Sequence, residues 1–230
     1  MGVTRSIGRQ LAPRVVPRVT QLAPGLSASF VREALHRALD GAGPFTGAAA
    51  LADKLLRGTD GDVDAAVKDV VDHHIRYAGV QGFATNLGGL VTMTVAVPAN
   101  ITGLAVLQDR MVAGVAHLRG YDLDDPRVHN AILVTTIGED DVHALVKKGK
   151  IPAPPMALAT APMHDPSVDA LVSAEVASDL ITRVAGKRLA TTMGRRIPGV
   201  GGLVGMGTDG WSTYKIGRYA EEELLPRRRR

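Results

Sequence analysis

The stretch YAGVQGFATNLGGLVTMTVAVPANITGLAVLQ, residues 77–108, contains no formally charged side chain. A helix that spans a bilayer needs about 20 consecutive, mainly apolar residues, so a run of this length must be weighed as a membrane span. Gly88 and Gly89 interrupt the run, Pro98 interrupts it again, and polar residues such as Asn100 dilute it. Because each remaining apolar piece is short, we favour a buried helical hairpin over a bilayer span.

Small residues recur four apart along this stretch, as at Ala78 and Gly82. Residues four apart lie on one face of a helix, so the spacing creates smooth patches that another helix backbone can approach closely. A second segment of the same character, IPGVGGLVGMGTDG at residues 197–210, places Gly201 and Gly205 one turn apart. We therefore predict two Gly-rich hydrophobic helical segments that pack closely.

The composition favours helices packed on helices. Hydrophobic residues make up 45% of the 230 residues, but aromatic residues only 3%. A sandwich of strands would use more aromatic and β-branched side chains. We predict an all-α, compact helical bundle with a single domain over residues 25–225. A basic, proline-punctuated lead over residues 1–24 precedes it, and a basic tail over residues 226–230 follows it.

Capping and breaking residues place the other helices. Ser29 can cap a helix that runs to about Asp40. Asp125 and Asp165 each precede a proline, which is a typical helix start. We expect further helices over about 46–57, from about 63 past 75, after 126, after 166 and up to 223, with a proline-rich loop over 151–162.

The letters GMGTDG at residues 205–210 match the G-x-G-x-x-G pattern of dinucleotide-binding loops. That fingerprint needs a strand before the first glycine and an acid about 20 residues later, and a Walker A loop needs a lysine that this segment lacks. The chain has no cysteine, no HExxH and no G-x-S-x-G. We expect no phosphate loop, cofactor, metal site or catalytic residue of these kinds.

Both ends of the chain are basic. Every charged residue before Glu33 is an arginine, and the last four residues are arginines. Basic arms are attracted to anionic surfaces, although they also serve as solubilising tails. Nucleic acid ranks last among the partners, because no aromatic residues alternate with the charges. The candidate membrane contacts are Arg5, Arg9, Arg14, Arg18, Arg227 and Arg228.

Two segments of the chain, NLGGLVTMTVAVPANITGLAVLQDRMVAGVAHLRGYDLDDPRV (86–128) and AGKRLATTMGRRIPGVGGLVGMGTDGWSTYKIGRYA (185–220), resemble the EcsC family. The resemblance covers about residues 60–222, and GYDLDDP and IPGVGG are its specific elements. Asn100 stands where the family has an acid. The motif residues are Gly88, Gly89, Pro98, Asn100, Asp122, Asp124, Asp125, Pro198, Gly199, Gly201 and Gly205.

The resemblance implies an α-helical protein whose family namesake is encoded beside components of an ABC transporter. No established reaction accompanies it, so no catalytic residue is carried over. We expect a non-enzymatic accessory or scaffold protein in the cytoplasm, at the inner face of the membrane, linked to a transporter or secretion system. Its partner would be an anionic membrane surface or a membrane protein, and its oligomeric state stays open.

The alternative is an enzyme or a small-ligand-binding protein with a pocket between the Gly-rich helices. Asp122, Asp124, Asp125 or His117 would provide the polar lining of that pocket. We favour a structural role for these acids, because Asp-Pro is a helix-start signal and GYDLDDP is rich in turn-forming residues.

Overall fold

The computed structural model describes the backbone of residues 27–42, 45–87, 93–194 and 200–227, and the side chains within these ranges except at 42, 80–102 and 184–208. The all-α prediction is confirmed, since the strands within these described ranges form a single two-residue pair. In chain order the elements are α2 (Ala28–Asp40), β1 (Gly41–Ala42), β2 (Phe45–Thr46), α3 (Ala48–Gly58), α4 (Val63–Leu87), α5 (Met93–Leu118), α6 (Pro126–Ile137), α7 (Glu139–Lys147), α8 (Pro155–Ala159), α9 (Pro166–Gly194) and α10 (Val200–Glu223).

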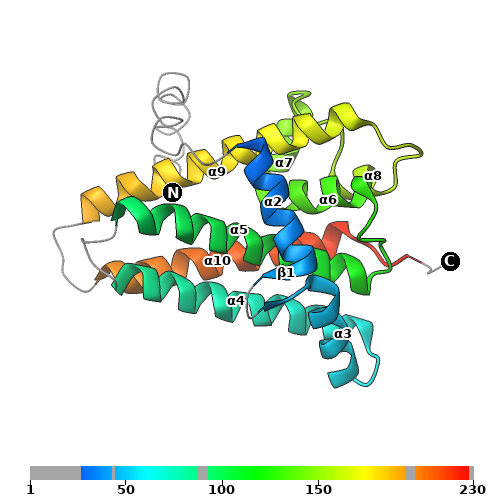
Figure 1. Ribbon diagram of the computed structural model, residues 1–230, viewed down its shortest axis with the longest axis horizontal. Coiled ribbons are helices and arrows are strands. Elements are labelled where there is room, and N and C mark those ends of the chain that lie inside the picture. The colour runs from blue at the N-terminus through cyan, green and yellow to red at the C-terminus, as the bar shows by residue number, and fades with distance from the viewer. Residues whose placement is uncertain (1–26, 43–44, 88–92, 195–199, 228–230) are drawn as a thin grey trace.

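Four long helices, α4, α5, α9 and α10, give the molecule two different ends. The end of α4, the start of α5, the end of α9 and the start of α10 all lie at the left end of Figure 1. The shorter helices and the C-terminus lie toward the right end (Figure 1). We call the right end the body. We call residues 77–87 of α4 and 93–108 of α5 the hairpin arm.

Helix starts follow the capping residues. Asp125 accepts a hydrogen bond from the Arg127 backbone N–H at 2.9 Å, and Asp165 accepts one from Ser167 at 2.9 Å. These bonds confirm both predicted Asp-Pro starts. Ser29 was the wrong cap for α2. Ser27 caps it, because its extended backbone lets its hydroxyl accept from the Phe30 N–H at 3.2 Å.

Two predicted interruptions were also wrong. Pro98 does not break the hydrophobic run, because it lies in the second turn of the 26-residue helix α5, where it removes one backbone hydrogen bond. The proline-rich segment 151–162 is not all loop, because α8 begins at Pro155. A proline is favourable at that position, since the first residues of a helix need no N–H partner.

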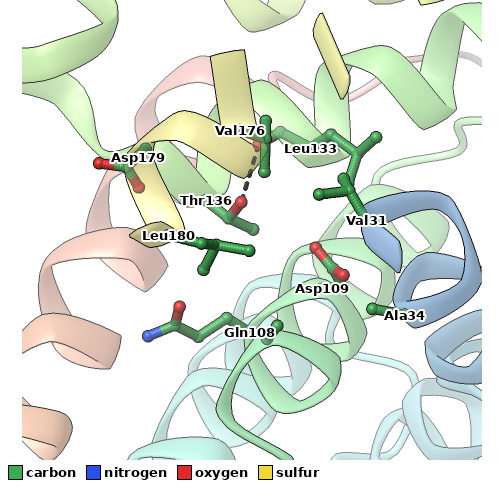
Figure 2. A pocket seen from close by; sticks show the side chains of 10 residues that line it. Val31, Ala34, Gln108, Asp109, Leu133, Thr136, Val176, Asp179 and Leu180 are labelled. Carbon is green, nitrogen blue, oxygen red and sulfur yellow. Dashed lines mark hydrogen bonds between the residues drawn. The ribbon is translucent and has the colours of Figure 1, made fainter. Parts of the chain in front are cut away.

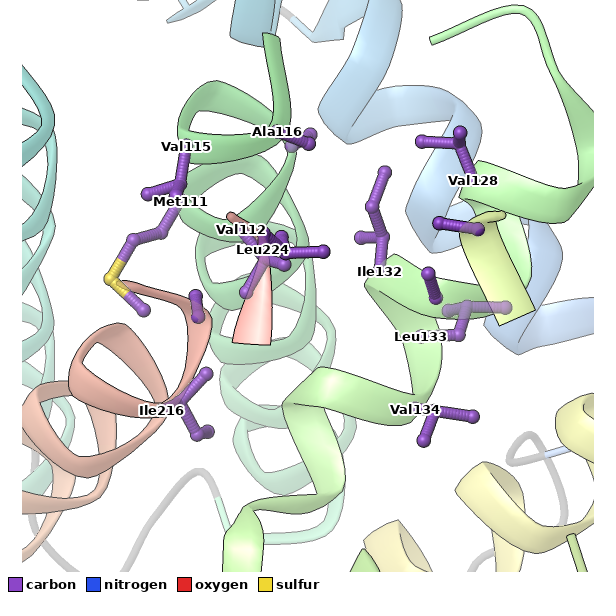
Figure 3. Close-up of a cluster of buried hydrophobic side chains, with 14 of the residues drawn as sticks. Met111, Val112, Val115, Ala116, Val128, Ile132, Leu133, Val134, Ile216 and Leu224 are labelled. Atoms are coloured by element: carbon purple, nitrogen blue, oxygen red, sulfur yellow. The ribbon is translucent and has the colours of Figure 1, made fainter. Parts of the chain in front are cut away.

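Helix α5 is the centre of the core. Its residues 111–116 are all buried, so the helix is surrounded by protein at this level. It packs against α2, α3, α4, α6 and α10. Figure 3 shows Met111 and Val112 of α5 facing Ile132 of α6 and Ile216 of α10. Small and medium-sized side chains therefore fill the space between several helices at once, as the low aromatic content predicts.

Glycines set the spacing of α4, α5 and α10. A Cβ atom added to Gly217 of α10 would lie 2.6 Å from Val71 Cγ1 of α4 and 3.4 Å from Met111 Sδ of α5. One added to Gly114 of α5 would lie 3.1 Å from Val70 Cγ1. Close helix approach through small residues is thus real in the body. Contacts at the glycines of the hairpin arm lie outside the described side chains.

One hydrogen-bond network joins α2 to α6 and α9. The Arg32 guanidinium donates to Ser173 Oγ at 2.7 Å, to Asn130 Oδ1 at 2.6 Å and to the Asp169 carbonyl at 2.8 Å. Asn130 Nδ2 in turn donates to Asp169 Oδ1 at 2.7 Å. Because Asn130 lies on α6 and the other two partners on α9, a single side chain joins three helices.

The glycine spacing predicts the effect of adding one methyl group to α10. Gly217→Ala should lower the free energy of unfolding by about 1–3 kcal/mol, because overpacking forces α10 away from α4. Gly58→Ala is the control, because its new Cβ would meet nothing within 4 Å. Urea unfolding measures both variants. A Gly217→Ala protein as stable as the wild type would contradict the close approach.

Candidate functional site

A cleft of about 440 Å³ lies in the body between α2, α3, the end of α5 and the start of α6. Sites for small molecules have volumes of about 300–1,000 Å³. Imidazole and carboxylate groups dominate the polar lining. We call it the His/Asp cleft, and these groups belong to His36, His117, His129, Asp40, Asp122 and Asp124.

Hydrogen bonds hold two of the imidazole rings. His117 Nε2 lies 2.8 Å from Asp53 Oδ1 of α3. His129 Nε2 donates to the Leu123 carbonyl at 2.6 Å, and its ring meets the His36 ring edge to face at a centroid distance of 6.0 Å. These contacts fix rings from α5 and α6 against α2 and α3, so the cleft has defined walls.

The acids of GYDLDDP have two kinds of role, because some form a turn or a helix cap and some line the cleft. Asp122 Oδ1 accepts from the Asp124 N–H at 3.0 Å, so it forms the predicted turn while lining the cleft. Asp125 caps α6 and pairs with Arg127 at 2.5 Å. Hydrogen bonding to Arg127 lowers the pKa of Asp125, which favours its charged form. The cleft thus collects Asp122, Asp124 and His117 of the predicted lining, but Asp125 is not part of it.

The His/Asp cleft lies at the body end. The predicted pocket between the Gly-rich helices would fall where side chains are not described, so it stays a prediction. Sequence reasoning also missed His36, Asp40 and His129 as partners of this lining. They come from α2 and α6, and no local spacing signals that these helices meet the end of α5.

For several other predicted motif residues, the structure describes the backbone but not the side chain. Pro98 and Asn100 lie in α5, and Gly201 and Gly205 lie in the first turns of α10. The letters GMGTDG are therefore helical and form no phosphate-binding loop, as predicted. Several residues lie outside the described ranges: Gly88, Gly89, Pro198, Gly199, Arg5, Arg9, Arg14, Arg18 and Arg228.

Arg227 lies at the body end. Its backbone N–H donates to the Arg119 carbonyl at 2.8 Å, and its guanidinium carbon lies 5.4 Å from the centroid of the Tyr121 ring. Tyr121, which lines the His/Asp cleft, also donates its hydroxyl to the Leu225 carbonyl at 3.0 Å. The start of the C-terminal tail is thus folded onto the end of α5, far from the helix ends at the left of Figure 1.

Exposed aromatic side chains stand where the hairpin arm leaves the body. Tyr77 is 46% exposed, Trp211 61% and Tyr214 41%. Trp211 stacks on Tyr214 at a centroid distance of 5.4 Å. A Cβ atom at Gly210 would lie 4.0 Å from the Ile75 carbonyl oxygen, so these parts of α4 and α10 are at one level. We call Tyr77, Trp211 and Tyr214 the aromatic collar.

Helix α5 carries a buried carboxyl group at the residue that follows the hairpin arm. Asp109 of α5 is 3% exposed and makes no hydrogen bond or ion pair within the described residues. It lines a cavity of about 10 Å³, room for a single water molecule. Figure 2 shows it among apolar neighbours such as Val31 and Leu180. Burial raises the pKa of Asp109 to about 8, so the group is mainly protonated at neutral pH.

Asp179 of α9 lines the same cavity and has a partner, since its carboxylate pairs with Arg183 Nε at 2.7 Å. Burial raises the pKa of Asp179 to about 6, and the charge of Arg183 opposes that rise. In the described part of the chain, no group of three or more His, Asp or Glu side chains is arranged to hold a metal ion.

Comparison with protein-family models, curated proteins and solved structures finds no match to this chain.

The burial of Asp109 predicts a particular pH dependence of stability. Between the unfolded pKa of 3.8 and the folded pKa of about 8, the folded state keeps a proton that the unfolded state releases. Stability therefore falls as pH rises through this window, by about 1 kcal/mol between pH 7 and 8. Asp109→Asn should remove most of that loss, as measured by urea unfolding at both pH values.

Two other buried groups titrate outside the pH 7–8 interval, so a change of stability within this interval can be assigned to Asp109. Asp179 has a pKa of about 6, and burial lowers the pKa of His74 to about 4, so both titrate below this interval in the folded state. Asp122→Asn is the matched control, because Asp122 is exposed. An equal loss of stability in wild type and Asp109→Asn would contradict the prediction.

Proposed function

We propose that this protein is a non-enzymatic accessory or scaffold protein, similar to the EcsC family, that docks on the inner face of a membrane with its hairpin arm foremost. The observation that carries the proposal is the aromatic collar, which lies at the level where the charged residues of α4 and α5 end. A link to a transporter or secretion system follows from the family resemblance.

The charge pattern changes at the collar. Arg76 is the last charged residue of α4 before the arm, and Asp109 is the first one of α5 after it. Trp and Tyr are enriched at membrane–water interfaces, where the ring meets acyl chains and the polar atom meets water. Exposed aromatic residues between a charged body and an uncharged arm suit an interfacial position for Tyr77, Trp211 and Tyr214.

The length of the arm suits one leaflet. The eleven residues from Tyr77 to Leu87 extend α4 by roughly 15 Å, because a helix rises 1.5 Å per residue. A bilayer has a hydrocarbon core about 30 Å thick. Within the described residues, no helix combines the length and the apolar character needed to cross a membrane. The arm is therefore suited to partial insertion.

Basic residues near the hairpin arm predict a preference for anionic lipids. The sequence that joins α9 to α10 carries Arg195 and Arg196, and Lys187 and Arg188 precede it in α9. Basic segments near a membrane are attracted to anionic headgroups, by about 1 kcal/mol for each Lys or Arg near the surface. Arg227 lies at the body end, so it would face away from this membrane.

The sole tryptophan provides a direct test. Wild-type protein should co-sediment with vesicles that contain phosphatidylglycerol at low salt, and the fluorescence of Trp211 should shift to shorter wavelength. Trp211→Ala with Tyr214→Ala should weaken binding by roughly tenfold or more, because burial of one large apolar side chain contributes about 1.5–3 kcal/mol. Sedimentation across a lipid titration measures the change.

Met163→Ala is the control for this experiment. Met163 is 80% exposed in the loop between α8 and α9, and that loop lies toward the right end of Figure 1, so its removal should leave vesicle binding unchanged. Failure of the wild type to bind anionic vesicles at low salt would exclude membrane docking. An equal loss in Met163→Ala would show that the collar has no special role.

A further inference from the structure

We propose that Arg110, Phe45, His73 and Tyr77 form a binding site for the phosphate group of an anionic lipid such as phosphatidylglycerol. We call these four residues the Arg110 site. The inference deepens the proposed membrane contact and rests on it, because Tyr77 belongs both to this site and to the aromatic collar.

The Arg110 guanidinium is a buried charge without an acidic partner. Arg110 is 6% exposed, and its one side-chain hydrogen bond within the described residues runs from Nη2 to Thr46 Oγ1 at 3.0 Å. Its Nε is buried there with no hydrogen-bond partner. All 23 Asp and Glu residues of the sequence have described side chains, yet none of them forms an ion pair with Arg110.

This lack of a partner favours an anionic ligand. A buried charge loses its solvation, and an opposite charge must offset that loss. Arg183, which is less buried than Arg110, has such a partner in Asp179 at 2.7 Å. An anion from outside the chain would supply the partner that Arg110 lacks. A phosphate suits this role, because guanidinium N–H groups match phosphate oxygens in geometry.

Aromatic rings lie around this charge and are partly open to solvent. The Arg110 guanidinium carbon lies 5.8 Å from the centroid of the Phe45 ring, and that ring meets the Tyr77 ring edge to face at 6.2 Å. Phe45 is 48% exposed and Tyr77 is 46% exposed. An aromatic ring attracts a cation but carries no net charge to neutralise it. The site therefore combines a positive charge with an apolar rim, which suits a phosphate that carries acyl chains.

Further positive charge acts on the same place. The His73 ring lies 4.8 Å from the Tyr77 ring, measured between centroids. Burial lowers the pKa of His73, and the positive charges of Arg110, Arg76 and Lys54 lower it further. An anion bound beside His73 would therefore lie in a positive potential produced by three helices, α3, α4 and α5.

The position of the Arg110 site suits a lipid headgroup. Tyr77 begins the α4 part of the hairpin arm, and Arg110 follows the α5 part by two residues. In the proposed orientation, the site lies where the uncharged arm meets the charged body, which is the depth of the polar headgroups. The phosphate of the lipid would contact Arg110, and its acyl chains would extend in the direction of the arm.

Dihexanoyl phosphatidylglycerol, used below its micelle concentration, tests the site on the intact protein without a membrane. Amide NMR spectra recorded during a titration should show saturable shifts for residues 45–46, 73–77 and 110. Arg110→Gln should weaken binding by about tenfold or more, because the charged donor is lost. Phe45→Ala should weaken it by about threefold or more, because part of the apolar rim is lost. Thermal unfolding checks both variants, and the exposed position of Phe45 keeps the test decisive if Arg110→Gln does not fold.

Two controls separate a specific lipid site from general charge attraction. Arg57→Gln removes the same charge from an exposed position on α3, and it should leave binding unchanged. Inorganic phosphate lacks acyl chains, so it should bind more weakly by roughly tenfold or more. The proposal is overturned if the lipid shows no saturation below about 5 mM. Equal binding of inorganic phosphate, or an equal loss in Arg57→Gln and Arg110→Gln, would also overturn it.

This titration and the vesicle sedimentation experiment can fail separately. A protein that binds the soluble lipid at the Arg110 site but does not sediment with vesicles would support the site and exclude membrane docking. A protein that sediments with vesicles but does not bind the soluble lipid would overturn the site and leave docking to the aromatic collar.

Discussion

The fold depends on the burial of α5 on all sides by helices that approach it closely. Side chains at 111–116 are enclosed, and Gly114 and Gly217 let α4 and α10 pack without intervening bulk. Protein interiors are packed as densely as organic crystals, so such a contact tolerates few changes of volume. The position of α10 against α4 sets the level of the aromatic collar, and the position of α5 sets where its end meets α2 and α6.

The two ends of the molecule differ in chemistry for a physical reason. The body has enough elements to cover α5 with apolar side chains and to pair its polar groups, as the Arg32 network does for α2, α6 and α9. The hairpin arm extends beyond the short helices of the body (Figure 1). The absence of charge over residues 77–108 is the physical basis for the proposed membrane contact.

The His/Asp cleft and the proposed membrane contact involve opposite ends of α5. Residues from His117 to Asp124 border the cleft, whereas the arm begins with the other end of the same helix. Asp109 is buried between them and makes no hydrogen bond or ion pair within the described residues, so its titration probes the packing between α5 and α9.

The sequence by itself determined the helical class, the Asp-Pro helix starts and the helical character of the Gly-rich segments, because these follow from local periodicity and capping. It also singled out Asp122, Asp124 and His117 as polar candidates. Tertiary structure alone decided that His36, Asp40 and His129 join them, because no local pattern shows that α2 and α6 meet the end of α5. It also decided that Pro98 stays within α5 and that α8 forms in the proline-rich segment. Composition alone overestimates the free-energy cost of these prolines. Pro98 removes a single backbone hydrogen bond early in a long helix, and a proline at a helix start removes none.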